Sequence, residues 1–392
     1  MMAKQFLEVF WRELRGLFHG RVPLACLLLG TPLGFTLLFG VIYGENVVNH
    51  IPLVIYDEDQ SSLSRKVIQA YADADRFTVT DYVQSEEEMR AALLHGYGKA
   101  ALEIPRDFAQ NVKHGNSAEV LLVVNSANNM FGNATIAASQ EIARNLEVSV
   151  ATSMLESGGL LPASALNNAY PVRLGVRITG DPANGYAAFM LGGLMLNGLQ
   201  IGIMVSLSPL LITEILRRRY GRNYPSWLLE LAGLLPYACV AFAGYLLSLL
   251  VLIHGFAVPM RGSWGDVLAL GGAFIFFVCC VLMLFSACVP SRELSLQAPM
   301  VYIMPGLLYS GLSWPPFDMS QVAAAFGALL PMTYAGISLR DSMLLGYSPS
   351  LWSNVGIMLA AAAGCFLVSC GIFHWRRQRG FRRAQAEGEV AA

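Results

Sequence analysis

The sequence contains few charged residues. Only 14% of its 392 residues are Asp, Glu, Lys or Arg, whereas a soluble domain averages roughly 25%. Hydrophobic residues make up 55% of the chain, and many of them lie in long runs without a charge. This composition excludes an ordinary soluble globular protein and predicts a membrane protein.

Ionisable groups are absent from the interiors of the longest apolar runs. Six runs are long enough to cross a bilayer, which takes about 20 residues. Ion-coupled carriers and proton pumps usually keep an ionisable group at membrane depth, so their absence argues against ion coupling. The six predicted spans are Val22–Tyr43, Gly185–Ile212, Leu231–Ile253, Val267–Val289, Leu294–Ser313 and Leu351–Phe373.

Recognisable catalytic and cofactor motifs are also missing. No G-x-x-x-x-G-K-[ST] loop occurs, so the chain lacks the usual cradle for a nucleoside triphosphate. The seven cysteines have no C-x-x-C partner or nearby histidine, which argues against a metal site or a disulfide framework. The acidic run Asp57–Asp59 is interpreted as solvated helix caps, since acids favour helix N-termini. We expect no catalytic residue, no metal and no resident cofactor in this chain.

Residues 44–184 differ from the rest. They hold 17 acidic and 10 basic residues, and their apolar runs are too short to span. Residues 51–56, 77–81, 99–104 and 120–124 are predicted strands. Ser85 and Glu88 form a capping box that begins a helix, and residues 133–156 have helical spacing. This pattern predicts one α/β domain inserted between the first and second spans.

The predicted fold class is therefore an α-helical polytopic membrane protein with six transmembrane helices and an inserted α/β extracytoplasmic domain. Residues 1–21 form an amphipathic helix in the membrane interface, and 22–43 form the first span. The α/β domain covers 44–184, and the five further spans lie within 185–374. Within that last part we expect a polar loop at 213–227 and a re-entrant hairpin at 314–333, before a basic tail at 375–392.

Lysine and arginine are distributed asymmetrically around the predicted spans. Fourteen of them flank the spans on one side, and only Arg261 and Arg340 lie in short loops on the other. Positive charge beside spans is retained in the cytoplasm. Both termini and the 213–227 loop are therefore predicted to be cytoplasmic, with the α/β domain on the opposite side.

The 213–227 loop admits two interpretations. It carries Glu214 and the arginines Arg217, Arg218, Arg219 and Arg222 between two spans. The charges are either a topology signal alone or also a docking element on which a soluble partner acts.

The last third of the chain resembles a known family. Ser291, Arg292, Glu293 and Gln297 resemble a short polar turn before the fifth span of type-2 ATP-binding-cassette exporter permeases. An S-G…P…P-x-T-Y…R pattern is similar as well, at Ser310, Gly311, Pro315, Pro331, Thr333, Tyr334 and Arg340. The likeness is to the bacterial subgroup with a large periplasmic domain. The central loop departs from the family pattern, because an arginine run and Gly221 replace an acid-rich sequence.

The resemblance implies a permease subunit in the bacterial inner membrane that exports an amphipathic or hydrophobic substrate. A separate cytoplasmic ATPase would bind ATP and Mg and dock on the central loop and on Arg12 and Arg15 of the first helix. A second permease subunit, identical or different, would complete the transporter. Engagement of a periplasmic adaptor stays open, and no nucleic acid is expected.

Two other classes remain open from the residues. The chain is alternatively an envelope-anchored receptor or assembly protein whose periplasmic domain binds a partner, or a membrane-embedded enzyme. Six spans exceed what an anchor needs, and the missing polar cluster argues against an enzyme. Co-purification of an ATPase separates the transporter from both.

Overall fold

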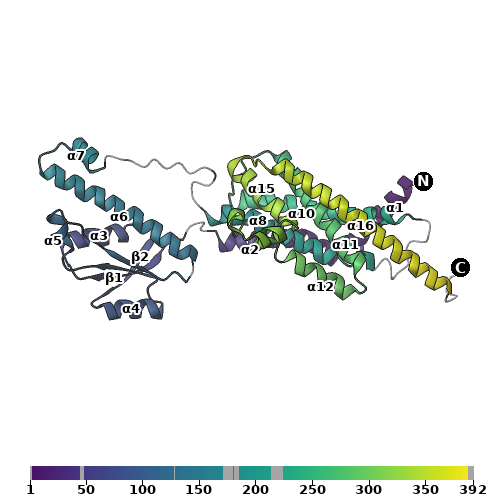
Figure 1. The fold of residues 1–392 in the computed structure, drawn as a ribbon, viewed down its shortest axis with the longest axis horizontal. Coiled ribbons are helices and arrows are strands. Elements are labelled where there is room, and N and C mark those ends of the chain that lie inside the picture. Colours follow the sequence, from purple (N-terminus) through teal and green to yellow (C-terminus); the bar gives the residue numbers. More distant parts are fainter. Residues whose placement is uncertain are drawn as a thin grey trace. The chain divides into compact units, whose positions relative to one another are not determined.

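The computed structural model describes residues 2–44, 48–127, 129–170, 180, 185–212 and 224–386, apart from the side chains of 129–130 and 380–386. It divides into two compact units (Figure 1). One comprises Met1–Asn46 with Ile178–Ala392, and the other is Val47–Arg177. Each unit is considered by itself.

The first unit is a bundle of apolar helices. Among the described residues, five helices are long and apolar enough to cross a membrane. They are α2 (Val22–Ile42), α8 (Tyr186–Leu207, continued by a turn to Ile212), α10 (Ser226–Gly255), α11 (Trp264–Cys288) and α16 (Leu351–Ala386). The amphipathic helix α1 (Met2–His19) packs against α10 and α2. The predicted tail begins inside α16, because the last helix continues through the basic residues.

The predicted span Leu294–Ser313 is wrong as a single helix. The chain forms α12 (Arg292–Ile303) and α13 (Gly306–Tyr309), with a break at Met304 and Pro305. Proline has no N–H to donate, and its ring clashes with the preceding turn. A 12-residue helix rises only about 18 Å, too little to cross a bilayer unaided.

A bent pair of helices follows the broken segment. A short 3-10 turn, Pro316–Asp318, precedes α14 (Gln321–Gly327), and α15 (Pro331–Leu345) follows. The axes of α14 and α15 differ by 87°, so the pair is either a broken span or a re-entrant loop. If it is a broken span, the described residues contain six candidate spans.

One acid lies inside a candidate span, contrary to the prediction that no span interior holds an ionisable group. Helix α10 begins at Ser226, five residues before the predicted start of that span, and so includes Glu230. The Glu230 side chain is fully buried. His254 lies in the last turn of the same helix.

Glycines let α8 approach α2 closely. A Cβ atom added at Gly198 would lie 2.8 Å from Phe35 Cγ and 2.9 Å from the Thr31 carbonyl oxygen. The small-xxx-small pair Gly198 and Gly202 therefore serves packing within the chain. Gly30 and Gly34 on α2 have nothing of this chain within 4 Å of an added Cβ.

The second unit contains a four-stranded sheet in the order β2-β1-β3-β4. The strands are β1 (Ile51–Asp57), β2 (Phe77–Val83), β3 (Ala100–Ile104) and β4 (Leu121–Val124). Strand β1 is parallel to both β2 and β3, and β4 is antiparallel to β3. The four predicted strands are thus present, with ends shifted by one or two residues.

Helices cover both faces of this sheet, as Figure 1 shows. Helices α3 (Ser62–Ala72), α5 (Phe108–Lys113) and α6 (Asn129–Ser157) pack on one face, around Leu53 and Leu102. Helix α4 (Glu86–His95) packs on the other, where Met89 meets Val54. The predicted cap Ser85 accepts a hydrogen bond from the first turn of α4, and Ser61 does the same for α3. Helix α7 (Pro162–Ala169) packs against α6.

Candidate functional site

The candidate site lies where α8 ends and α10 begins, which we call the loop end of the bundle. The predicted docking residues Glu214, Arg217, Arg218, Arg219 and Arg222 lie outside the described residues. The description resumes at Tyr224, just before α10. Helix α1 and the C-terminal part of α16 also lie at this end (Figure 1).

Helix α1 presents different faces to the bundle and to its surroundings. Val9, Glu13 and Leu17 are buried, whereas Trp11 and Phe18 are about half exposed. The apolar residues of α1 therefore form two groups. One group packs against α10, and the other is exposed on the surface of the unit. This division suits a helix that lies in a membrane interface. Of the predicted docking arginines on α1, Arg15 is exposed and Arg12 is half-buried.

A partly buried ion pair joins α1 to the bundle. Arg21, at the start of α2, places Nη2 2.9 Å from Glu13 Oε2 and donates from Nη1 to the Tyr237 hydroxyl at 2.7 Å. Burial lowers the pKa of Arg21, but attraction to Tyr237 and Glu13 outweighs burial and raises it overall. Loss of either charge would therefore weaken the attachment of α1 to the start of α2.

Tyr224 is the point where three segments meet. Its hydroxyl donates to Glu8 Oε2 of α1 at 3.0 Å, and its carbonyl accepts from Arg377 Nη1 of α16 at 2.7 Å. The hydrogen bond to Glu8 raises the pKa of Tyr224, and the charge of Arg12 opposes that rise. Arg12 is therefore close enough to the loop exit to act on it electrostatically.

The C-terminal helix makes the remaining polar contacts at the loop end. His374 Nδ1 lies 3.1 Å from the Ser226 hydroxyl, and the Ser369 hydroxyl donates to Glu230 Oε1. Sequence reasoning assigned the basic residues of this helix to topology and missed these contacts. The sequence could hardly have indicated these contacts. The short stretch 374–379 is rich in basic residues, but no local pattern in it shows which residues elsewhere in the chain they contact.

The family-motif residues lie elsewhere, around the α14–α15 bend. Pro331 occupies the first turn of α15, where a missing N–H is tolerated. Thr333 Oγ1 donates to the Gly327 carbonyl at 2.6 Å, and the Tyr334 hydroxyl donates to the Ala328 carbonyl at 2.6 Å. Carbonyls at the end of a helix lack partners within that helix. The P-x-T-Y sequence thus closes the end of α14 and fixes the bend.

The other motif residues shape the chain on either side of this bend. Gly311 has φ of +81°, and a Cβ there would lie 2.5 Å from Ile337 Cδ1, so only glycine fits. Pro315 directly precedes the 3-10 turn. On α15, the guanidinium of Arg340 lies 4.9 Å from the centre of the Phe189 ring of α8, a cation–π distance.

Arg292 and Glu293 begin α12 at the turn after α11, apart from the α14–α15 bend. Ser291 caps this helix by accepting from the Leu294 N–H at 3.3 Å. Hydrogen bonds from its own backbone N–H and from Ser291 lower the pKa of the Glu293 carboxyl. An acid in the first turn also favours the helix dipole.

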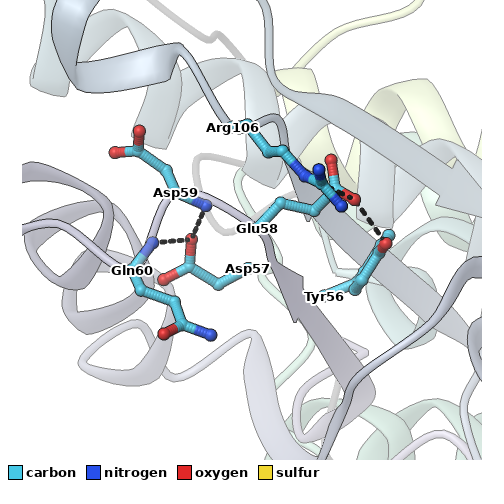
Figure 2. Close-up of polar contacts among 6 residues, drawn as sticks. All are labelled: Tyr56, Asp57, Glu58, Asp59, Gln60 and Arg106. Carbon is cyan, nitrogen blue, oxygen red and sulfur yellow. Dashed lines mark hydrogen bonds and ion pairs between the residues drawn. The ribbon is translucent and has the colours of Figure 1, made fainter.

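The carboxyl end of β1 is the obvious place to look for a site in the second unit. The strand order puts β1 between β2 and β3, and ligands of open α/β sheets bind at such switch points. Figure 2 shows that Asp57 and Glu58 there bind other groups of the same chain. Asp57 Oδ1 accepts from the Asp59 and Gln60 N–H groups at 3.1 and 3.0 Å. Glu58 Oε1 accepts from the Tyr56 hydroxyl at 2.6 Å and lies 3.7 Å from Arg106 Nε.

The interpretation of the Asp57–Asp59 run as helix caps holds only for Asp59, because α3 is capped by Ser61. Asp57 Oδ2 also accepts from Ser64 of α3 at 2.7 Å, and Asp59 Oδ2 accepts from the Ala109 N–H of α5 at 3.3 Å. The run therefore joins β1 to two helices. Throughout the described part of the chain, no group of three or more His, Cys, Asp or Glu side chains is arranged to hold a metal ion.

Comparison with known proteins identifies the family. The chain is 24% identical over 282 residues to the probable multidrug ABC transporter permease YbhR of Escherichia coli, across 69% of this chain and 72% of that protein. It is 31% identical over 98 residues to ABC transporter G family member 20 of Dictyostelium discoideum, and this match covers 25% of this chain and 13% of that protein. Residues 24–370 match the family described as ABC-2 family transporter protein. Since the match covers most of the chain, the protein belongs to the ABC-2 family of membrane transporter proteins.

Proposed function

We propose that this protein is the membrane-spanning subunit of an ATP-driven exporter that moves an amphipathic or hydrophobic substrate outward. The observation that carries this proposal is the loop end of the bundle. There, α1 and α16 both bind Tyr224, at the exit of the arginine-rich loop. Force applied to that loop by a separate ATPase would reach α1, α10 and α16 together. ATP and Mg would be bound by the ATPase and not by this chain.

The proposed orientation follows from charge. Lysine and arginine concentrate on the side of the loop end, which makes that side cytoplasmic by the positive-inside rule. Both termini then lie in the cytoplasm, and the sheet-containing unit lies in the periplasm of a bacterial cell. With both termini inside, the chain must cross the membrane an even number of times, so α12 and α13 together would form the sixth crossing as a broken span. The α14–α15 pair is then a re-entrant hairpin that enters from the outer side.

Tryptophan exposure supports the placement in a membrane. All six tryptophans lie in the described residues, and their exposed fractions run from 43% to 64%. Five of them lie near the ends of predicted spans and the sixth lies on α1, as expected of amphipathic rings at a membrane interface. The related E. coli protein is called a probable multidrug permease. We propose that this protein, too, carries an apolar or amphipathic substrate, and that it works as one of a pair of permease subunits.

The function as a receptor or assembly protein is favoured by one observation. A groove of about 410 Å³ lies between α3 and α6 of the second unit, lined by Ala70, Asp73, Arg76, Glu141, Ile142 and neighbouring residues. Its mixed charges and apolar floor suit a segment of another protein. A periplasmic adaptor docking here would be compatible with export as well.

Co-purification tests the proposal. The tagged chain is extracted from its native membrane in mild detergent and purified without added nucleotide. We expect a second polypeptide with a phosphate-binding loop to accompany it, and the complex to hydrolyse ATP. Recovery of periplasmic partners alone, with no ATP-hydrolysing chain, would overturn the exporter and favour the receptor function.

A further inference from the structure

The cytoplasmic end of α16 makes three contacts with the segment that leaves the central loop. Arg377 Nη1 donates to the Tyr224 carbonyl at 2.7 Å, and His374 lies 3.1 Å from the Ser226 hydroxyl. One turn deeper, Ser369 donates to Glu230. Going from 224 to 230 along the segment, the partners go from 377 back to 369. The two segments are thus joined in antiparallel register over more than one helical turn.

The deepest of these contacts is shielded from solvent. Ser369 and Glu230 are both fully buried, and the side chains that contact the Glu230 carboxyl are Ser369 and its neighbour Cys370 on α16. A buried carboxyl group depends strongly on the few partners it has. The start of α10 therefore cannot slide along α16 without breaking the buried hydrogen bond between Ser369 and Glu230.

The same stretch of α16 also binds the turn between α11 and α12. Arg376 Nη1 donates to the Ala287 carbonyl at 2.5 Å and to the Val289 carbonyl at 2.8 Å. These carbonyls lie at the end of α11, where backbone acceptors lack partners and a positive charge is favoured. Two residues further, Ser291 begins the turn into α12. One helix end thus binds both the loop exit and the α11–α12 turn.

We propose that the end of α16 is a third coupling arm of the transporter, beside the central loop and α1. His374 and Arg377 are positioning residues that hold the loop exit against α16, and Arg376 passes its displacement to the α11–α12 turn. This inference rests on the proposed function, since it assumes an ATPase that acts on the loop. It assigns to the basic end of α16 a role in addition to orientation in the membrane.

Position 379 supplies a matched control. Arg379 carries the same charge on the same helix, two residues beyond Arg377, but its guanidinium stacks on Trp375 at 3.7 Å from the ring centre. No hydrogen bond connects it to the 224–230 segment within the described residues. Arg377→Gln and Arg379→Gln therefore remove the same charge, and only the first removes the contact with the loop exit.

The experiment uses the whole chain in lipid nanodiscs with its co-purified ATPase. Permease-dependent ATP hydrolysis is normalised to inserted protein, and hydrogen–deuterium exchange is followed in peptides covering 224–230. Loss of one charge-assisted hydrogen bond corresponds to a change of about fivefold or more. We expect Arg377→Gln to lower stimulated hydrolysis by about fivefold and to speed exchange in these peptides. Arg377→Lys, which keeps one donor and the charge, should recover part of both, and Arg379→Gln should match the wild type.

Other results would overturn the inference. Wild-type hydrolysis and exchange in Arg377→Gln would show that the contact does not position the loop. An equal loss in Arg379→Gln would show that the charge of the tail acts without the contact. If Arg377→Gln fails to insert, a double-mutant cycle of Ser226→Ala and His374→Ala takes its place, and additive effects on hydrolysis would refute the coupling. If no ATPase is stimulated even by the wild type, the proposed function itself fails.

Discussion

Close packing of α8 on α2 leads to a stability prediction at Gly198. An alanine Cβ there would lie 2.9 Å from the Thr31 carbonyl oxygen and 2.8 Å from Phe35 Cγ, whereas ordinary contacts of this kind begin near 3.4 Å. The carbonyl belongs to the backbone of α2 and cannot rotate away. The two helices must therefore separate by about half an ångström, and overpacking of this kind costs about 1–3 kcal/mol.

Gly34→Ala is the matched control for Gly198→Ala. Replacing glycine by alanine in a helix is by itself favourable by about 1 kcal/mol, and this gain is common to both variants. At Gly34 nothing of this chain lies within 4 Å of the added Cβ, so only the gain remains. The difference between the two variants isolates the steric cost, and we expect Gly198→Ala to be the less stable by about 1–3 kcal/mol.

Reversible unfolding of the purified protein in mixed micelles, with increasing denaturing detergent, measures this difference. The oligomeric state of each variant is determined in parallel by light scattering. Equal stability of Gly198→Ala and Gly34→Ala at an unchanged oligomeric state would refute the packing argument. A larger loss in Gly34→Ala, together with dissociation, would instead place a second copy on the open face of α2.

Three further predictions concern orientation, the central loop and pH. A reporter fused at Gln378 should signal cytoplasm and one at Asn116 the outer compartment; a cytoplasmic signal at Asn116 would reverse the orientation. Replacing Arg217–Arg219 together by lysine, or Glu214 by alanine, should leave insertion intact but weaken ATPase stimulation severalfold, because lysine cannot pair bidentately; unchanged stimulation in both would leave the loop a topology signal alone. Burial, aided by neighbouring acids, raises the pKa of the Glu103 carboxyl in the second unit. The folded protein therefore loses stability as pH rises from the pKa of Glu103 in the unfolded chain to its higher pKa in the folded protein, and the loss persists at pH 7. Glu103→Gln should therefore stabilise the protein at pH 7 and make no difference below about pH 3, as thermal unfolding across pH would show; a gain of equal size at both pH values would contradict this.

Much of the layout could be predicted from local sequence. The lengths of apolar runs predicted six spans, and five of them are continuous helices, because a helix rises about 1.5 Å per residue and a bilayer has a fixed thickness. Ser61 and Ser85 marked helix starts, since a serine hydroxyl satisfies backbone N–H groups there. The strands of the second unit followed from alternating and continuous apolar patterns. These features depend on neighbours in sequence.

Two misjudged boundaries show the limit of run length as a guide. Residues 294–313 carry no charge, yet Pro305 divides them into two helices. Glu230 was taken as a flanking residue, but α10 begins before it and encloses it. A charge ends an apolar run in the sequence, but it does not end a helix when Ser369 of another helix supplies a hydrogen bond.

The candidate site shows most clearly what only the tertiary structure decided. The family resemblance indicated Thr333 and Tyr334, but it did not indicate what they do. In the structure, their hydroxyls donate to backbone carbonyls at the end of α14. By itself, the sequence determined the membrane class and the charge asymmetry, and it predicts the loop at which a partner would act. Folding decided which side chains meet at the exit of that loop. Glu8 lies 216 residues from Tyr224, and Arg377 lies 153 residues from it. No local pattern specifies such partners, because each contact depends on how whole helices pack against one another.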